Sequence, residues 1–349
     1  MQEEQKQQAI REILAAICQT SQPANEVIQA YTRQRRYIGS HDRRFITDIV
    51  WKYMRFQAHI DFLHYTLDDV INKEITDTDD IPDWIRLECP QWLLSHIPDA
   101  KHELKALQDT APTIVRAVGD RVQIQSLLVD EGIESTPTQR SPYGLILKKR
   151  YNLQASAAYK DGRIEVQDEG SQLAALACRI QPGDSVLDFC AGAGGKSLMF
   201  SQIMNGTGQI TSHDISAVSL KKLEERAKRA HAHNIITTTQ MPKGTFSVVV
   251  VDAPCSGTGV WRRQPDARWK LTERTFEHLL AKQAQILQSV VPCVQHRLCY
   301  ITCSITRDEN EEQIRRFMKA NPAFSLVEEQ RLSPWRSQTD GFYIALLER

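Results

Sequence analysis

The first hundred residues have apolar side chains at the spacing of amphipathic helices. Ile10, Ile13 and Ile17 recur every three or four residues, and Phe45 and Ile49 begin a second run of the same kind. This period places the members of each run on one face of a helix, and a neighbouring element must cover that face. We therefore predict that this part of the chain is a helical domain.

From residue 105 to about 165 the pattern changes to short mixed elements. Apolar stretches predict strands over 113–118 and 144–147, and residues 122–130 between them have a helical pattern. These elements predict a small α/β domain.

From about residue 170 onward, short apolar runs alternate with helical segments. The predicted strands are 185–188, 209–213, 235–238, 246–251, 298–302, 324–327 and 342–347. Apolar strands separated by helices predict a parallel sheet that is covered on both faces. Ligands bind beyond the carboxyl ends of the strands in such sheets. We therefore expect the chemistry just after Asp188, His213, Val251 and Thr302.

The composition is that of an ordinary globular protein. The chain has 349 residues, of which 41% are hydrophobic and 25% charged. No apolar run approaches the ~18 residues that a membrane span needs. The first residues lack the apolar stretch of a secretory signal, so we expect a cytoplasmic protein.

The formal net charge is zero, because 43 basic and 43 acidic residues balance. This balance argues against an indiscriminate polycation but not against RNA. Residues 68–90 contain eight acidic side chains and two basic ones, whereas basic residues cluster over 31–55, 148–163 and 262–274. Local basic clusters of this kind can contact phosphates although the whole chain is neutral.

The chain contains eight cysteines, which we expect to be thiols in a reducing compartment. They are Cys18, Cys89, Cys178, Cys190, Cys255, Cys293, Cys299 and Cys303. No C-x-x-C pair occurs, and the last three lack the histidine partners of a zinc knuckle. We therefore predict no metal site.

A glycine-rich loop, 190–196, follows the first strand of the alternating region. Its end resembles a Walker A motif, but Cys190 stands where a phosphate loop needs its first glycine. Asp214 ends the next strand, where an acid can bind the ribose of S-adenosylmethionine, although a helix N-cap explains Asp214 alone equally well. The glycine loop and Asp214 together favour a site for the nucleoside part of S-adenosylmethionine. The expected cofactor contacts are Cys190, Ala191, Gly192, Ala193, Gly194, Gly195, Lys196, Asp214 and Asp252.

Two cysteines follow the ends of predicted strands, in Asp252-Ala-Pro-Cys255 and Thr302-Cys303-Ser. Either cysteine alone is more simply a buried structural thiol, but two at equivalent strand ends favour chemistry. A thiolate that adds to carbon 6 of a pyrimidine makes carbon 5 nucleophilic toward a sulfonium methyl group. A base must then remove the proton from carbon 5. Asp252 is an acid that can be held near nitrogen 3 of the pyrimidine ring.

These segments resemble the RNA cytosine-5 methyltransferases of the RsmB/NOP/Sun type. The similar stretches are 162–171, 186–196, 252–259, 262–269, 300–304 with 309–311, and 340–345. The resemblance implies a class I, Rossmann-like methyltransferase domain in which Cys303 is the nucleophile and Cys255 the thiol that releases the product. Two positions depart from the family pattern. Ala193 replaces the usual proline, and residues 237–241 contain no acid for the adenine, for which Gln240 is only a weak substitute.

Residues 41–50 resemble NusB-like helical RNA-binding domains, which bacterial small-subunit rRNA methyltransferase B has before its catalytic part. The expected RNA contacts are Arg35, Arg36, Arg43, Arg44, Arg262, Arg263 and Arg268, with a solvated helix face as the plainer alternative for such arginines. The predicted fold is multidomain, α + α/β. It comprises a helical NusB-like domain (1–104), a small α/β RNA-binding linker domain (105–165) and a methyltransferase domain (166–349).

The sequence thus predicts a monomeric enzyme that transfers a methyl group from S-adenosylmethionine to carbon 5 of a cytosine in RNA. Small-subunit rRNA is the expected substrate, and a covalent bond between Cys303 and carbon 6 the expected intermediate. A tRNA methyltransferase is the nearest alternative. A P-loop NTPase leaves both cysteine motifs unexplained, and an RNA-binding scaffold without catalysis is the remaining alternative, motivated by the missing adenine-side acid.

Overall fold

The computed structural model describes residues 1–77 and 80–349 of the chain. These residues form two compact units, one of residues 1–110 and 260–276, the other of residues 111–259 and 277–349. The structure thus groups the chain differently from the three consecutive ranges of the sequence analysis. The segment 260–276 joins the N-terminal helices, and the small and large sheets share one unit. Among the described residues, no helix has the length and apolarity needed to cross a membrane.

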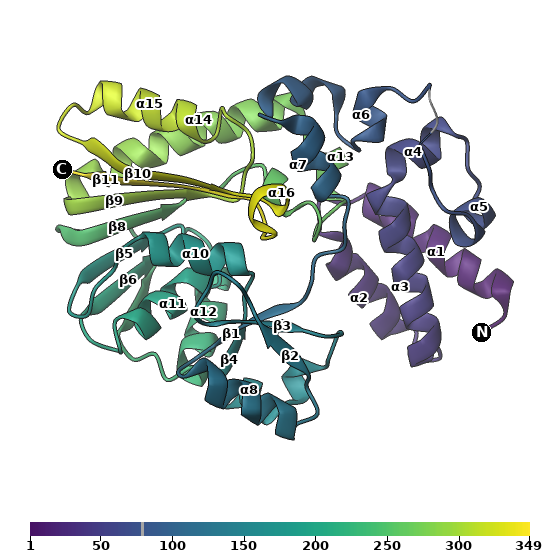
Figure 1. Cartoon of the computed structure of the whole chain (residues 1–349), viewed down its shortest axis with the longest axis horizontal. Helices are drawn as coiled ribbons and strands as arrows, with labels where there is room; N and C mark the ends of the chain where they lie inside the picture. Colours follow the sequence, from purple (N-terminus) through teal and green to yellow (C-terminus); the bar gives the residue numbers. More distant parts are fainter. Residues whose placement is uncertain (78–79) are drawn as a thin grey trace. The chain divides into compact units, whose positions relative to one another are not determined.

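The first unit is helical, as the apolar periodicity predicts (Figure 1). Its elements are α1 (Glu3–Cys18), α2 (Ala24–Gln34), α3 (Ser40–Arg55), α4 (Gln57–Phe62), α5 (Leu67–Asn72), α6 (Asp83–Arg86), η1 (Gln91–His96), α7 (Ala100–Ala106) and α13 (Ala267–Lys270). Ile10, Ile13 and Ile17 of α1 are buried against Ile46 and Val50 of α3. Burial of such apolar stripes supplies most of the stability of a helical domain.

The segment 260–276 is an integral part of the helical unit. The Asp266 carboxylate accepts a hydrogen bond from the Ala24 backbone N–H at 3.1 Å. The Arg268 guanidinium donates to the carbonyl oxygens of Arg55, at 3.3 Å, and Leu107, at 3.1 Å. Arg268 has no exposed surface, and its guanidinium lies 5.4 Å from the ring centroid of Trp261.

The second unit contains a small antiparallel sheet in the order β2-β3-β1-β4. Its elements are β1 (Ile114–Ala117), α8 (Arg121–Asp130), β2 (Ser135–Pro137), β3 (Gly144–Leu147), η2 (Leu153–Ala155), α9 (Ala157–Lys160) and β4 (Ile164–Val166). Ile124 and Leu128 of α8 pack on Val115 and Leu145 of the sheet. The two strands and the helix predicted here are present within one residue or two of their expected bounds.

The large sheet has seven strands in the order β10-β11-β9-β8-β5-β6-β7. Its strands are β5 (Ser185–Phe189), β6 (Gln209–His213), β7 (Ile235–Thr238), β8 (Phe246–Asp252), β9 (Val294–Thr302), β10 (Ser325–Leu332) and β11 (Phe342–Glu348). The five strands from β7 to β9 are parallel, as predicted. The last two are not, because β10 and β11 form a hairpin that pairs antiparallel with β9.

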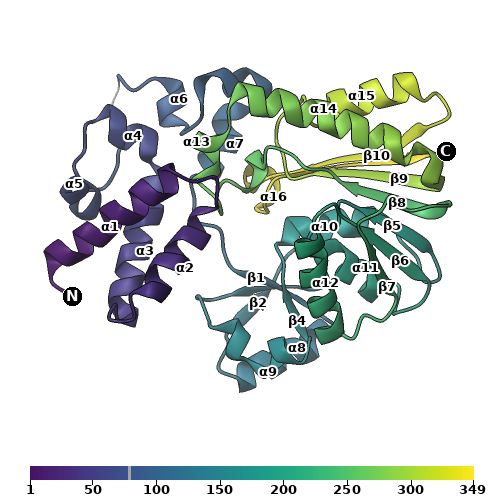
Figure 2. The same cartoon turned by 180° about the vertical axis from the view of Figure 1, so that it is seen from behind.

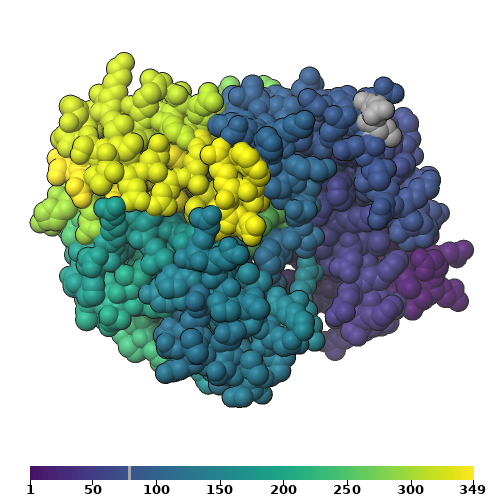
Figure 3. All heavy atoms as spheres, viewed as in Figure 1, coloured from purple at the N-terminus to yellow at the C-terminus, as the bar shows by residue number. Residues whose placement is uncertain are grey.

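Helices cover both faces of this sheet (Figure 1, and from behind in Figure 2). One face is covered by α10 (Glu169–Ala177) and α11 (Gly195–Ile203), with α12 (Ala217–Arg229) packed against α11. The other is covered by α14 (Glu273–Val290) and α15 (Glu311–Ala320). In the space-filling view the yellow surface includes the residues of α16 (Pro334–Ser337), whereas β11 is buried (Figure 3). The remaining short elements are η3 (Thr258–Val260), η4 (Val291–Cys293) and α16 (Pro334–Ser337).

Replacement of Arg268 by alanine tests whether this side chain stabilises the helical unit. The variant loses the donor for two carbonyl oxygens and leaves a cavity, so we expect a loss of about 3 kcal/mol in the free energy of unfolding. Urea unfolding followed by circular dichroism measures this change. Arg44, which is exposed on α3, is the control, and Arg44→Ala should change the stability by less than about 0.5 kcal/mol. Equal stability of the two variants would contradict the structural role of Arg268.

Candidate active site

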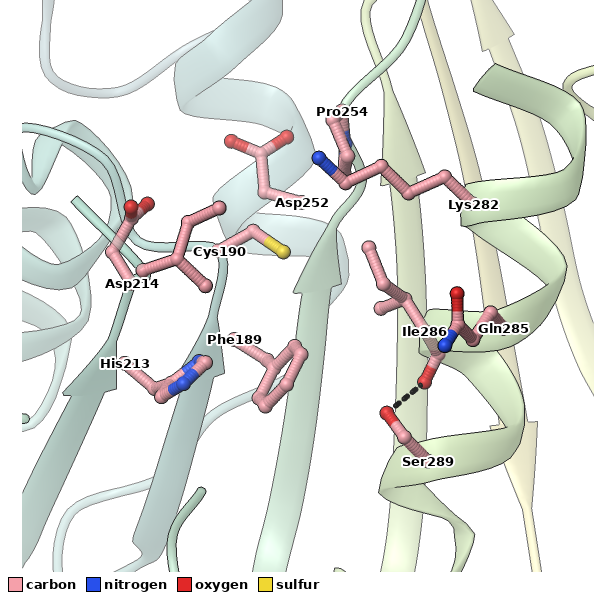
Figure 4. Close-up of a pocket in the computed structure, with 11 residues that line it drawn as sticks. Phe189, Cys190, His213, Asp214, Asp252, Pro254, Lys282, Gln285, Ile286 and Ser289 are labelled. Atoms are coloured by element: carbon pink, nitrogen blue, oxygen red, sulfur yellow. Dashed lines mark hydrogen bonds between the residues drawn. The ribbon is translucent and has the colours of Figure 1, made fainter. Parts of the chain in front are cut away.

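A pocket of about 440 Å³ lies beyond the carboxyl ends of β5, β6 and β8, where the sheet topology predicts a ligand (Figure 4). Strand-end residues form one side of the pocket, and α14 forms the other. The lining residues are Phe189, Cys190, His213, Asp214, Ile215, Asp252, Pro254, Lys282, Gln285, Ile286 and Ser289. The apolar rings and side chains among them offer flat surfaces to an aromatic ligand, and the two carboxylates offer acceptors to hydroxyl or amino groups.

Asp214 fixes the glycine loop as well as lining the pocket. One carboxylate oxygen accepts from the Gly192 backbone N–H at 2.8 Å, and the other accepts from the Ser216 N–H at 2.8 Å. Ser216, not Asp214, is the side-chain cap of α12. Asp214 therefore connects the loop after β5 to the loop after β6, and this connection shapes the pocket.

The glycine loop has the tight backbone that its sequence predicts. Gly194 has a φ of +79°, and a Cβ atom there would lie 2.3 Å from the Leu223 side chain. Cys190 also has a positive φ, of 68°. Burial raises the pKa of the Cys190 thiol to about 12, so this cysteine is a poor nucleophile at neutral pH. Of the predicted cofactor residues, Cys190, Asp214 and Asp252 line the pocket, and Ala191, Gly192, Ala193, Gly194, Gly195 and Lys196 form the loop behind them.

Lys196 is buried and forms an ion pair with Asp252, in which the Nζ to Oδ2 distance is 2.6 Å. Burial lowers the Lys196 pKa, but the negative charges of Asp252, Cys303 and Asp188 outweigh this effect, and the pKa is raised overall. The ammonium group is thus a positive charge next to Asp252, which lines the pocket. A Walker A lysine would instead extend its ammonium group toward phosphates.

Asp188 is a site residue that the sequence analysis did not single out beyond its place at a strand end. It is fully buried, and its carboxylate accepts a hydrogen bond from the Ser197 hydroxyl at 2.5 Å. Burial raises the pKa of Asp188 to about 7. The hydrogen bond connects the end of β5 to the first turn of α11, the two elements that flank the glycine loop, and so helps to fix the ends of that loop.

Cys255 and Cys303 lie side by side, with 3.4 Å between their Sγ atoms. They follow β8 and β9, which are adjacent parallel strands with Asp252 opposite Ile301. Both thiols are only partly exposed. The two sulfur atoms thus lie in contact with each other next to Asp252 and Pro254, which line the pocket, although neither cysteine is itself a lining residue.

Glu309 and Asn310 fix the two cysteine loops, and the sequence analysis quoted them only as part of a motif. The Glu309 carboxylate accepts from the Ser256 backbone N–H at 2.7 Å. Asn310 accepts from the Thr302 hydroxyl at 2.6 Å and donates to the Ser304 carbonyl at 2.9 Å. Neither residue has exposed surface. Glu309 thus binds the loop that carries Cys255, and the next residue, Asn310, binds the loop that carries Cys303.

The α14 side of the pocket was missed by the sequence analysis. Lys282, Gln285, Ile286 and Ser289 follow the i, i+3, i+4, i+7 spacing of one helix face. Their mixed chemistry gives no sequence signal for a ligand, because the same pattern suits a helix at the edge of a core. Gln240, the predicted substitute for the missing adenine-side acid, is not among the lining residues.

The seven arginines predicted to contact RNA lie in different environments. Arg36 and Arg44 are exposed, and Arg43 donates from Nε to the Ile38 carbonyl at 2.9 Å. Arg35 lies 3.7 Å from the Tyr31 ring centroid and 3.4 Å from the Glu12 carboxylate.

The predicted contact with RNA is wrong for Arg262 and Arg268, because both side chains are buried within the helical unit. The neighbouring Arg263 is partly exposed. A guanidinium without exposed surface cannot reach a phosphate in this conformation. Within residues 1–77 and 80–349, no cluster of histidine, cysteine or acidic side chains could hold a metal ion.

Sequence comparison relates this chain to rRNA methyltransferases. Residues 175–348 match the profile of the family described as 16S rRNA methyltransferase RsmB/F. The chain is 30% identical to ribosomal RNA small subunit methyltransferase B of Vibrio vulnificus, and 28% identical to the protein of that name from Photorhabdus laumondii. Each match covers 74% of this chain and 66% of the relative, so the chain spans slightly less than two thirds of the length of these relatives.

Solved structures share the fold at lower sequence identity. The crystal structure of PH0851 superimposes with a TM-score of 0.84 at 22% identity, covering 98% of this chain and 99% of that one. NSun6 from Pyrococcus horikoshii has a TM-score of 0.66 at 18% identity, covering 72% of this chain and 94% of its own. The first likeness extends over both compact units. By the profile match, residues 175–348 of the chain belong to the 16S rRNA methyltransferase RsmB/F family.

Proposed function

We propose that this protein transfers a methyl group from S-adenosylmethionine to carbon 5 of a cytosine in RNA, with small-subunit rRNA as the substrate. The observation that supports this proposal most strongly is the pair of thiols, 3.4 Å apart, beside a nucleoside-sized pocket. Methylation of carbon 5 needs a nucleophile for carbon 6 and a group that accepts the carbon-5 proton. Two adjacent thiols can divide these tasks.

The pocket residues suit S-adenosylmethionine. Asp214 can accept hydrogen bonds from ribose hydroxyls, because its oxygens accept only one backbone N–H each. Ile215 and Ile286 offer apolar contacts to an adenine ring. The loop 190–196 and Asp252 are the expected contacts of the methionine portion. When bound, S-adenosylmethionine supplies an electrophilic methyl group on a sulfonium sulfur.

The side chains of the protein supply the remaining chemistry. Cys303 adds to carbon 6 of the cytosine, so that electron density rises at carbon 5. Asp252, at the pocket wall and paired with Lys196, faces the ring edge at nitrogen 3. Cys255 accepts the carbon-5 proton when the bond between Cys303 and carbon 6 breaks. The target base must be unstacked for this attack, so we expect it in a loop or an opened helix.

Support for rRNA rather than tRNA comes from the relatives, two of which are named as small-subunit rRNA methyltransferases. The pairing of Lys196 with Asp252 disfavours the alternative of a P-loop NTPase, because that lysine would be needed at the phosphates. Exposed arginines on the helical unit, Arg36 and Arg44, are the candidates for phosphate contacts.

Single substitutions of the two cysteines should separate their roles. Cys303→Ala should lower methyl transfer at least about a thousandfold and form no covalent RNA adduct, since the nucleophile is lost. Cys255→Ala should instead accumulate the adduct, seen as a slowly migrating band on a denaturing gel. Cys18→Ala, an exposed thiol of the helical unit, is the control and should behave as the wild type. An adduct formed by Cys303→Ala would refute the assignment of roles.

Removal of the Asp214 carboxylate should weaken binding of the methyl donor. Loss of hydrogen bonds to a charged acceptor costs on the order of 1.5–3 kcal/mol, so Asp214→Ala should raise the Kd about tenfold or more. Titration calorimetry with S-adenosylmethionine measures this change. Glu225→Ala, an exposed acid on α12, should leave the Kd unchanged. Failure of the wild-type protein to bind the donor would favour the RNA-binding scaffold instead.

The choice of RNA can be tested on purified, unmodified substrates. Incubation with small-subunit rRNA and S-adenosylmethionine should produce one cytosine that resists bisulfite conversion, whereas tRNA should remain fully convertible. The same incubation with the Cys303→Ala protein is the negative control for each RNA, and it should leave every cytosine convertible. A resistant cytosine in tRNA alone would overturn the rRNA assignment while leaving the proposed chemistry intact.

A further inference from the structure

The two adjacent thiols lie in unlike electrostatic surroundings. Cys255 belongs to the loop after β8, which is fixed by the buried carboxylate of Glu309. Cys303 belongs to the loop after β9, and its charge acts on the buried ammonium group of Lys196. One sulfur thus has a fixed negative charge nearby, and the other a fixed positive charge. A low-dielectric interior strengthens both effects.

The negative charge of Glu309 is satisfied by neutral donors. Its Oε1 atom accepts from the Ser256 backbone N–H at 2.7 Å and from the Gln283 amide at 2.9 Å. Its Oε2 atom accepts from the hydroxyls of Ser256, at 2.5 Å, and Thr306, at 3.1 Å. These four bonds fill the carboxylate without cancelling its charge. The charge therefore remains a source of field inside the protein.

This field acts on Cys255. The hydrogen bond with Cys303, burial, and the charges of Cys303 and Glu309 all raise the pKa of Cys255 well above its usual value. The Gly257 backbone lowers it by a smaller amount. Tyr300, whose hydroxyl donates to the Glu309 carbonyl at 2.8 Å, is the other titratable group near the loop, and burial raises its pKa too. Lys196, which is paired with Asp252, responds to the other sulfur, because the charge of Cys303 raises the Lys196 pKa.

We propose that Glu309 is a positioning residue whose buried charge, bound to the loop that carries Cys255, disfavours a thiolate at Cys255 and so distinguishes this sulfur from that of Cys303. The protonated Cys255 sulfur then lies 3.4 Å from the Cys303 sulfur, within hydrogen-bond distance. The inference rests on the proposed function for its role in catalysis, but it concerns the protein without RNA or cofactor. It explains why two thiols of one site do not exchange roles.

A protonated Cys255 allows every proton of the proposed reaction to be accounted for. As the Cys303 sulfur bonds to carbon 6, the Cys255 proton passes to the Asp252 carboxylate, which faces ring nitrogen 3 and delivers the proton there, and Cys255 becomes a thiolate. After carbon 5 has received the methyl group, the Cys255 thiolate takes the carbon-5 proton. The electron pair of that C–H bond re-forms the ring double bond and expels the Cys303 thiolate. Nitrogen 3 then releases its proton to solvent, and both thiols return to their starting states.

Glu309→Gln removes the charge and can retain the hydrogen bonds. The glutamine oxygen can still accept from the Ser256 N–H and the Gln283 amide. The new NH₂ group faces the two hydroxyls, of Ser256 and Thr306, which can rotate and accept. The loop geometry is therefore conserved while the field disappears. This makes the substitution a test of charge and not of packing.

The experiment measures the pH dependence of alkylation at each thiol of the reduced full-length protein. Iodoacetamide is used under single-hit conditions, and Cys255 and Cys303 peptides are quantified by mass spectrometry. In Glu309→Gln the midpoint for Cys255 should fall by about one pH unit or more, since a like charge that raised it is gone. Glu312→Gln, which changes a half-buried acid on α15 that is paired with Arg315, should leave the Cys255 midpoint unchanged.

A second variant neutralises the same charge without changing Glu309. Gln283→Lys places an ammonium group against the carboxylate, and it should also lower the Cys255 midpoint. Glu309→Asp keeps the charge and should keep the midpoint near the wild-type value. The proposal is overturned if either folded neutralising variant alkylates at the wild-type midpoint, or if Glu309→Asp and Glu309→Gln shift it equally. Because no RNA or methyl donor is present, this outcome is independent of whether the protein proves to be a methyltransferase.

Discussion

The pairing of β8 with β9 is the constraint on which the candidate active site depends. Parallel strands end at the same edge of a sheet, so residues that follow two neighbouring strands come together there. Asp252 lies opposite Ile301, and the Ala253 N–H donates to the Ile301 carbonyl at 2.8 Å. Three further residues along each loop, or fewer, bring Cys255 and Cys303 into contact. A shift of one residue in this register would separate the sulfurs.

The second constraint is electrostatic, because several charges of the site are removed from water. Asp188 and Glu309 have no exposed surface, and Lys196 is almost fully buried. Burial of an isolated charge is costly, so Lys196 is paired with Asp252 and Glu309 accepts from neutral donors, whereas burial raises the pKa of Asp188 to about 7. The same partners fix the loops that hold the cysteines. The site is thus organised by the requirement to satisfy its own buried charges.

The helical unit shows how a sequence-local interpretation can fail. The basic residues of 262–274 follow the Pro-Cys motif directly, which suggests that they flank a bound base. In the structure this stretch contributes Asp266 and Arg268 to the interior of the helical unit, where they bind backbone groups of that unit. Arginine is suited to such a place, since one guanidinium can donate to several carbonyl oxygens. The candidate RNA contacts of the chain are accordingly its exposed arginines on α3 and before it.

The sequence by itself determined the helical character of the N-terminal part, the strands of the large sheet and the places of the cysteine motifs. Apolar periodicity is a local property, and it predicted that the N-terminal part is helical and where each strand of the large sheet lies. The cysteine motifs lie at the ends of those strands, so their meeting followed from the topology. Only the tertiary structure decided the antiparallel end of the sheet, the burial of Arg268, the α14 wall of the pocket and the contact of Glu309 with the Cys255 loop. Each of these depends on which distant segments pack together, and a charged side chain has the same local pattern whether it is solvated or buried.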